Sequence, residues 1–159
     1  MSIEVKIQKL HKDAKTPEMM SKSAGAYDLY VTEIVKKSNR FIVCKLGFAL
    51  QPPKTHRVVL SPRSSLTKHD WFMNNSPGVG DADYTGEYQM RFRATPIDVK
   101  LKTVGEEVKL ELVYPEFPYV EGDRVGQMYL EKIEKINWKE VDKLDETDRG
   151  DGGFGSTGK

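Results

Sequence analysis

The chain has 159 residues, and its 25 lysines and arginines nearly balance 24 aspartates and glutamates, which leaves a formal net charge of +1. This length predicts a single domain with a sizeable core, while the near-neutral charge argues against binding to the phosphate backbone of nucleic acids. There is no apolar run of membrane-spanning length and no signal peptide, and the single cysteine excludes an intrachain disulfide, so we expect a cytoplasmic protein that binds no membrane.

Apolar and polar residues alternate with a period of two along most of the chain, which is the pattern of half-buried β-strands. In chain order, strands are expected around residues 3–7, 42–50, 58–60, 88–94, 97–104, 108–114 and 125–133. Prolines and glycines predict turns at residues 52–53, 76–78 and 115–118, and helical periodicity is weak. Short strands at near-regular spacing favour an all-β sandwich or barrel without internal repeats.

Three residues invite a functional reading but are better explained by packing. Cys44 lies within the apolar alternation of residues 42–50, so we expect a buried strand residue rather than a nucleophile. Trp71 and Trp138 are likewise expected to be packing residues rather than a base-stacking platform. From residue 139 onward the chain is polar and is predicted to leave the core as an extended arm.

Four internal segments could carry chemistry. Residues 62–66 combine an arginine with two hydroxyls, which suits phosphate contact, although an ordinary serine-rich turn explains this segment better on its own. Residues 78–87 bracket Asp81 with glycines; Asp81 could orient or deprotonate a water, but a β-hairpin turn fits equally well. Residues 122–127 contain Asp123 and Arg124, which favour a structural ion pair, and residues 25–29 hold one acid, Asp28.

The last eleven residues, 149–159, are the most distinctive stretch of the chain. Five glycines exclude a stable helix or a packed strand. A glycine-rich backbone with Arg149 and neighbouring hydroxyls can bind phosphate, and Phe154 offers a face on which a base could stack. A disordered terminus or an expression scar remains an equal alternative for this segment taken alone.

Read in order, these five segments resemble the five motifs of the homotrimeric dUTP diphosphatase (dUTPase) family. The matching segments are residues 25–29, 62–66, 78–87, 122–127 and 149–158. The fourth and fifth matches are complete, and the fifth is highly specific. Three features depart from the family pattern: Ala26 replaces the usual glycine, Gly80 replaces the usual isoleucine, and the chain between Glu87 and Gly122 is longer.

The resemblance implies a fold, an assembly and a reaction. The fold would be a distorted jelly roll or β-barrel, with a core of residues 1–138, an inserted hairpin at about residues 97–114, and a C-terminal arm of residues 139–159 exchanged within a homotrimer. The reaction would be Mg²⁺-assisted hydrolysis of dUTP to dUMP and diphosphate by in-line attack of water on the α-phosphorus. It would keep uracil out of DNA and supply dUMP for thymidylate synthesis.

The resemblance also implies roles for individual residues. Asp81 would activate the water, and Asp28 would order the water shell of a Mg²⁺ ion that has no direct protein ligand. The residues that would contact the base and the sugar are Asn75, Gly78, Tyr84 and Phe154. The residues that would contact the phosphates are Arg63, Ser64, Ser65, Gln127, Arg149, Gly153, Ser156 and Thr157.

Two alternatives belong to other functional classes. A dCTP deaminase shares this fold but needs a glutamate in the strand after the third motif, and none occurs between Glu87 and Pro96. The other is a dUTP-responsive regulatory protein that contacts a protein partner through the hairpin of residues 97–114. The presence of all the expected catalytic residues favours the hydrolase over both.

Overall fold

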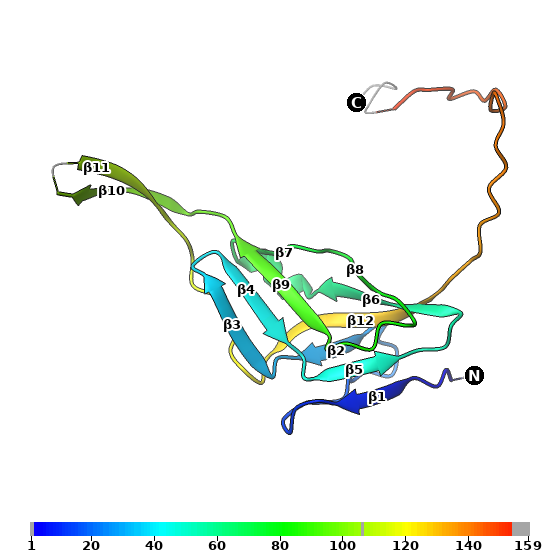
Figure 1. The fold of residues 1–159 in the computed structure, drawn as a ribbon, viewed down its shortest axis with the longest axis horizontal. Coiled ribbons are helices and arrows are strands. Elements are labelled where there is room, and N and C mark those ends of the chain that lie inside the picture. Colours follow the sequence, from blue (N-terminus) through cyan, green and yellow to red (C-terminus); the bar gives the residue numbers. More distant parts are fainter. Residues whose placement is uncertain (1, 106, 154–159) are drawn as a thin grey trace.

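The computed structural model of the chain describes residues 2–105 and 107–153. Two four-stranded antiparallel sheets form its body (Figure 1). The first sheet contains, in spatial order, β2 (Tyr27–Tyr30), β12 (Arg124–Lys132), β6 (His56–Pro62) and β8 (Gly78–Gly80). The second contains β3 (Glu33–Ser38), β4 (Phe41–Lys45), β9 (Gln89–Ala94) and β7 (Trp71–Met73). The prediction of an all-β fold is confirmed.

Two shorter ladders and one helical turn complete the described part of the chain. β1 (Lys6–Lys9) pairs with β5 (Phe48–Gln51), and β10 (Asp98–Val104) pairs with β11 (Glu107–Val113). A 3₁₀ helix, η1 (Ser64–Lys68), follows β6. No helix in the described part of the chain has the length and apolarity needed to cross a membrane.

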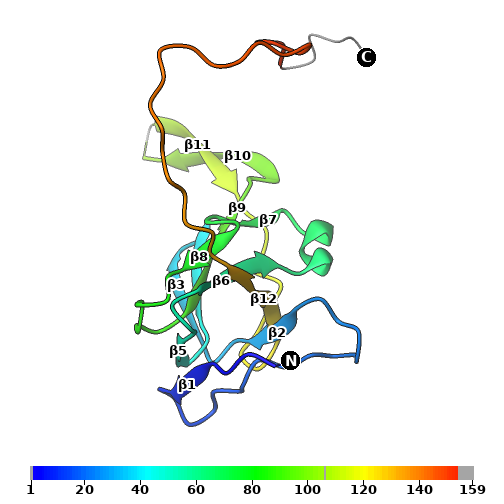
Figure 2. The same cartoon turned by 90° about the vertical axis from the view of Figure 1, so that its right-hand side faces the viewer.

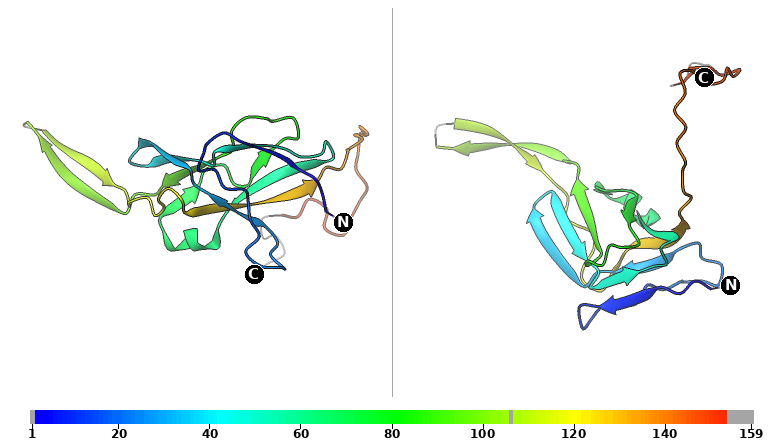
Figure 3. Two further views of the ribbon diagram at one scale, coloured as in Figure 1. Left: turned by 90° about the horizontal axis from the view of Figure 1, so that it is seen from below. Right: turned by 45° about the vertical axis from the view of Figure 1, so that its right-hand side comes forward.

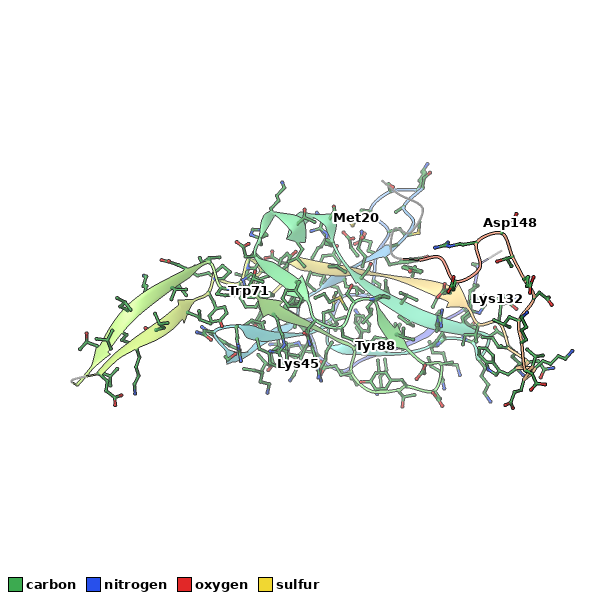
Figure 4. The ribbon with its side chains drawn as sticks, turned by 90° about the horizontal axis from the view of Figure 1, so that it is seen from above. Met20, Lys45, Trp71, Tyr88, Lys132 and Asp148 are labelled. Carbon is green, nitrogen blue, oxygen red and sulfur yellow. The ribbon has the colours of Figure 1, made fainter. Side chains whose placement is uncertain are left out.

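The core contains side chains from both sheets, and β9 shows how the sequence encodes it. Met90, Phe92 and Ala94 are buried, whereas Arg91 between them is exposed, as the period-two alternation predicts. Figure 4 shows the side chains gathered within the body of the two sheets. Cys44 is fully buried, and this burial raises the pKa of its thiol to about 12, so Cys44 is an inert packing residue, as predicted.

The predicted continuous strand of residues 42–50 is wrong. Gly47 has a φ of +70° and divides the segment into β4 and β5, which pair with different strands. A Cβ atom at residue 47 would lie 2.8 Å from Cγ2 of Thr32, so glycine is needed for both its conformation and its close contact. Both sides of this segment are buried, and the alternation therefore could not reveal the corner.

The hairpin of β10 and β11 projects from one end of the body (Figure 1). The amide of Ile97 donates to the carbonyl of Val113 at 2.8 Å, which closes the base of the hairpin. Beyond the base, Trp71 donates from Nε1 to the carbonyl of Glu116 at 3.0 Å and packs edge-on against Phe117 at 4.9 Å. Trp71 is therefore a packing residue, as predicted, and it anchors the chain where it returns from the hairpin.

The chain after β12 runs away from both sheets (Figures 2 and 3). Residues 133–153, which include the first part of the predicted arm, form no strand. They carry exposed apolar side chains, among them Ile136, Trp138 and Leu144. Trp138, which was predicted to be a packing residue, is 83% exposed and does not pack against the body of its own chain. The reason is that the arm already leaves the body at the end of β12.

The burial pattern predicts how two apolar truncations differ. Phe92→Ala removes a fully buried ring and should lower the free energy of unfolding by about 3–5 kcal/mol. Leu101→Ala, on the projecting hairpin where Leu101 is 74% exposed, should change it by less than about 0.5 kcal/mol. Urea denaturation at one protein concentration measures both values, and equal losses would contradict this assignment of the core.

Candidate active site

Four of the five distinctive segments lie on one sheet. β2 carries residues 27–30, β12 carries 124–132, β6 leads into the 62–66 segment, and β8 begins the 78–87 segment. Because the spatial order is β2, β12, β6, β8, segments that are far apart in sequence become neighbours. The register places Gln127 opposite both Asp28 and Ser61, and Leu60 opposite Gly78.

Asp28, on the edge strand β2, is a buried charge in this sheet. It is 3% exposed, and its Oδ2 accepts a hydrogen bond from Nη1 of Arg124 at 3.0 Å while its Oδ1 accepts one from Nε2 of Gln127 at 3.0 Å. Nε of Arg63 lies 3.9 Å from the same Oδ2, and Nη1 of Arg63 donates to the carbonyl of Arg124 at 3.2 Å. These four residues, hereafter the Asp28 network, join the ends of three strands around one carboxylate.

The predicted ion pair between Asp123 and Arg124 is wrong. Arg124 pairs with Asp28 instead, whereas Oδ2 of Asp123 accepts a hydrogen bond from the amide of Val120 at 2.8 Å. The amide of Asp123 also donates to the carbonyl of Val120 at 3.1 Å, so Asp123 closes a turn just before β12. The partner of Arg124 is 96 residues away in sequence, and local spacing could not identify it.

The 62–66 segment is a helical turn rather than an ordinary loop. Arg63 occupies the position before η1, which begins at Ser64. Ser64 is exposed, and the hydroxyl of Ser65 is buried with no hydrogen-bond partner among the described residues. This turn therefore places Ser64 and Ser65 directly after Arg63, which belongs to the Asp28 network.

A cavity of about 610 Å³ opens on the other side of β6. Four of the predicted site residues, Asn75, Gly78, Asp81 and Tyr84, line it together. One wall is the segment from Met73 to Gly80, and the other is the loop that follows β8. Among the described residues β8 pairs with β6 alone and is one of the two edge strands of its sheet, so its other edge presents unpaired backbone groups.

The loop of residues 81–87 is not the turn of a β-hairpin, so that alternative is wrong. β8 pairs with β6, whereas β9 pairs with β4 and β7, and the loop therefore crosses from one sheet to the other. Within it, the amide of Tyr84 donates to the carbonyl of Asp81 at 3.1 Å, and its hydroxyl donates to the carbonyl of Glu87 at 3.1 Å. These bonds fix the Tyr84 ring in the cavity wall, while Asp81 remains exposed.

The cavity is also lined by residues that were not predicted to form the site, among them Tyr88, Gln89 and Arg91. Tyr88 was assigned to the core from its place in the alternation, and it is 3% exposed, but its ring also reaches the cavity. Burial, with smaller contributions from Tyr84 and Asp81, raises the pKa of Tyr88 to about 12, so its hydroxyl is neutral at physiological pH. The sequence could have indicated Gln89 and Arg91, because both lie on the polar face of the strand predicted at residues 88–94.

The described residues do not bring all predicted site residues together. The cavity and the Asp28 network have no residue in common. Arg149 and Gly153 lie on the arm, where Nε of Arg149 donates to the carbonyl of Gly152 at 2.7 Å. Phe154, Ser156 and Thr157 lie outside the described residues.

The acidic residues fit a cation only if other ligands are supplied. Among residues 2–105 and 107–153, no group of three or more His, Cys, Asp or Glu side chains is placed to hold a metal ion. Each carboxylate oxygen of Asp28 accepts one hydrogen bond from its own network, and such an oxygen can accept a second. Each oxygen of Asp28 therefore retains some capacity to accept a further hydrogen bond, although the residue is only 3% exposed.

Comparisons with known proteins point to one family. A model of the dUTPase family matches residues 114–158. The deoxyuridine 5'-triphosphate nucleotidohydrolase of Helicobacter pylori is 33% identical over 158 residues, 98% of this chain and 97% of that protein. The protein of the same name from Rickettsia bellii is 35% identical over 160 residues, 98% of this chain and 95% of that protein.

Solved structures share the fold. A variant of the dUTPase of Staphylococcus bacteriophage 80alpha with dUpNHpp superposes with a TM-score of 0.75 at 22% identity, covering 98% of both chains. A variant of the dUTPase of S. aureus phage phi11, which coordinates a structural Mg(II) ion, gives 0.68 at 20% identity, covering 89% of this chain and 98% of that one.

The Asp28 network predicts an effect on stability. Asp28→Asn leaves the guanidinium groups of Arg63 and Arg124 without their counter-charge and should lower the free energy of unfolding by about 1–3 kcal/mol, less than for a fully buried pair because Arg124 is 38% exposed. The matched control is Glu131→Gln, which breaks the exposed pair with Arg57 and should cost at most about 1 kcal/mol. Urea denaturation compares the two, and the reverse order would refute the structural role of Asp28.

Proposed function

Since the chain belongs to the dUTPase family, we propose that it hydrolyses dUTP to dUMP and diphosphate by attack of water on the α-phosphorus. The observation that carries the proposal is the cavity in which Asn75, Gly78, Asp81 and Tyr84 meet. These are the residues that would recognise the base, accommodate the sugar and activate the water. By removing dUTP and forming dUMP, the enzyme would keep uracil out of DNA and supply thymidylate synthesis.

The edge of β8 would recognise uracil. Its unpaired backbone amides and carbonyls line the cavity and can pair with the edge of a base, while the Asn75 side chain adds a further contact. Cytosine presents its donors and acceptors in a different order and would leave buried groups unpaired, which discriminates strongly. Thymine adds only a methyl group, so its exclusion would depend on steric overlap in the closed pocket.

Tyr84 would select deoxyribose. The hydrogen bond from its hydroxyl to the carbonyl of Glu87 holds the ring in the cavity wall. A Cβ atom at residue 86 would lie 2.6 Å from the Tyr84 hydroxyl, so Gly86 is needed for this position of the ring. With the sugar against a fixed ring, a 2′-hydroxyl would have no room, and UTP would be a poor substrate.

Asp81 would act as the general base. Its exposed carboxylate at the cavity can accept a proton from a water molecule as the water oxygen bonds to the α-phosphorus. The bond from this phosphorus to the bridging oxygen then breaks, and the electron pair leaves with diphosphate. The same carboxylate would also contact the 3′-hydroxyl of the sugar.

The remaining residues would bind the triphosphate. From the core these are Arg63, Ser64, Ser65 and Gln127, and from the arm they are Arg149, Gly153, Ser156 and Thr157. Mg²⁺, when bound to the phosphates, neutralises their charge and makes the α-phosphorus easier to attack. Asp28 would hold the water shell of that ion.

We further propose a homotrimer in which each site is shared between chains. Two observations support it: the cavity and the Asp28 network have no residue in common within one chain, and the arm runs away from the body of its own chain. The core of residues 1–138 would supply the cavity and the Asp28 network. The arm of residues 139–159 would cross to a neighbouring chain, where Phe154 would cap the uracil.

The function is tested by diphosphate release from dUTP, dTTP, dCTP and UTP. We expect turnover of dUTP and at least about 100-fold lower kcat/KM for the other three nucleotides. Asp81→Asn should lower kcat for dUTP at least about 100-fold, since the base is lost while the shape of the side chain is kept. The control Asp83→Asn changes the other exposed aspartate of the same loop and should retain wild-type turnover.

Other outcomes of this assay would reject the proposal. Ammonia release from dCTP would identify a deaminase. Binding of dUTP without any turnover would favour a regulatory protein, with the hairpin of residues 97–114 as the candidate contact for its partner.

The arm predicts a separate loss of activity. Truncation after Asp148 should lower kcat/KM for dUTP by about 100-fold or more, because it removes the proposed phosphate donors and the base cap. Removal of Lys159 alone is the matched control and should have no such effect. Light scattering should give the same mass for both proteins, and wild-type kinetics in the truncated protein would refute a catalytic role of the arm.

A further inference from the structure

In the cavity wall, the ring of Tyr88 fills the space in which a side chain at residue 80 would lie. A Cβ atom at residue 80 would lie 2.4 Å from the hydroxyl oxygen of Tyr88 and 2.8 Å and 2.9 Å from two of its ring carbons. A Cβ atom essentially never approaches another non-bonded heavy atom this closely, so any side chain at residue 80 would displace the Tyr88 ring. Glycine at residue 80 and tyrosine at residue 88 therefore depend on one another.

The Tyr88 ring has little freedom to move aside. It stacks on Phe48 with the ring centroids 6.2 Å apart and an interplanar angle of 24°. Its backbone is fixed as well, since its amide donates to the carbonyl of Phe48 at 2.9 Å and its carbonyl accepts from the amide of Leu46 at 3.1 Å. Tyr88 lies in the body of the protein in Figure 4.

On its other side, the Tyr88 ring touches a residue of the proposed sugar site. The rings of Tyr88 and Tyr84 meet edge to face, with centroids 5.5 Å apart and an interplanar angle of 73°. The other bonds of Tyr84 to residues 2–105 and 107–153 lie within its own loop: its hydroxyl donates to the carbonyl of Glu87, and its amide donates to the carbonyl of Asp81. Tyr88 is thus the buried support between the core at Phe48 and the half-exposed ring of Tyr84.

We propose that Tyr88 is a positioning residue that sets the selection of deoxyribose over ribose, through its ring contact with Tyr84 and its fit over Gly80. This inference rests on the proposed function, since it assigns Tyr84 to the sugar. The ring acts rather than the hydroxyl, because the hydroxyl is buried without a hydrogen-bond partner among the described residues. The Tyr88 ring would fill the space that Gly80 leaves open. It would also support the ring of Tyr84 on the side that faces the core.

The test is a double-mutant cycle read out as the ratio of kcat/KM for dUTP to that for UTP. Tyr88→Leu should lower this ratio about tenfold, since small displacements of a positioning group change rates by one to two orders of magnitude. Gly80→Ile should lower it at least as much by displacing the ring. The double variant Gly80→Ile/Tyr88→Leu should return to within about threefold of the wild-type ratio, because the new side chain fills the vacated space.

Two further variants separate positioning from general packing. Tyr88→Phe keeps the ring and should hold the ratio close to the wild-type value. Phe92→Leu makes a similar aromatic-to-leucine change at a buried strand position outside the cavity. It should lower the melting temperature without changing the ratio.

Three results would overturn the proposal. One is a double variant whose loss equals the product of the two single losses, which would show that residues 80 and 88 act independently. The second is a loss of the ratio in Tyr88→Phe, which would assign the effect to the hydroxyl. The third is a change of the ratio in Phe92→Leu, which would make it a general effect of lost stability. Failure of the proposed function is distinguishable, because wild-type protein would then release no diphosphate from dUTP.

Discussion

The structure depends first on how one buried carboxylate is satisfied. Asp28 is removed from water, and an uncompensated charge there would be prohibitively costly, so its partners must be present and correctly placed. Arg124 and Gln127 come from β12, and Arg63 comes from the end of β6. Satisfying this single group fixes the register of three strands, and with it the positions of the serines that begin η1.

The same sheet explains why the site residues form separate groups. The Asp28 network spans the edge strand β2, its neighbour β12 and the end of β6, whereas the cavity lies at the opposite edge strand, β8. An edge strand has backbone groups to offer a ligand, and interior strands have none. The strand order therefore separates the backbone groups of β8, at one edge of the sheet, from the buried carboxylate of β2 at the other.

The sequence could predict those features whose signal is local. The alternation in β9 gave its buried face, the two strands expected at residues 97–104 and 108–114 form the hairpin, and the segments containing Asp28 and Asp81 drew attention by composition. It could not give the corner at Gly47, because burial on both sides hides the change of direction. Nor could it give the partner of Arg124 or the second contact of Tyr88, because both depend on which strands become neighbours.

The hairpin of β10 and β11 has a consequence for how this gene can change. Its two ends lie next to each other, joined by the bond from Ile97 to Val113, and the chain enters and leaves the body at almost the same place. The length of this segment therefore does not change the path of the core strands. Extending such a loop also costs little conformational entropy. Insertions, deletions or wholesale exchange at this point can diversify the outer surface in a single genetic event while the cavity beside β8 is inherited intact.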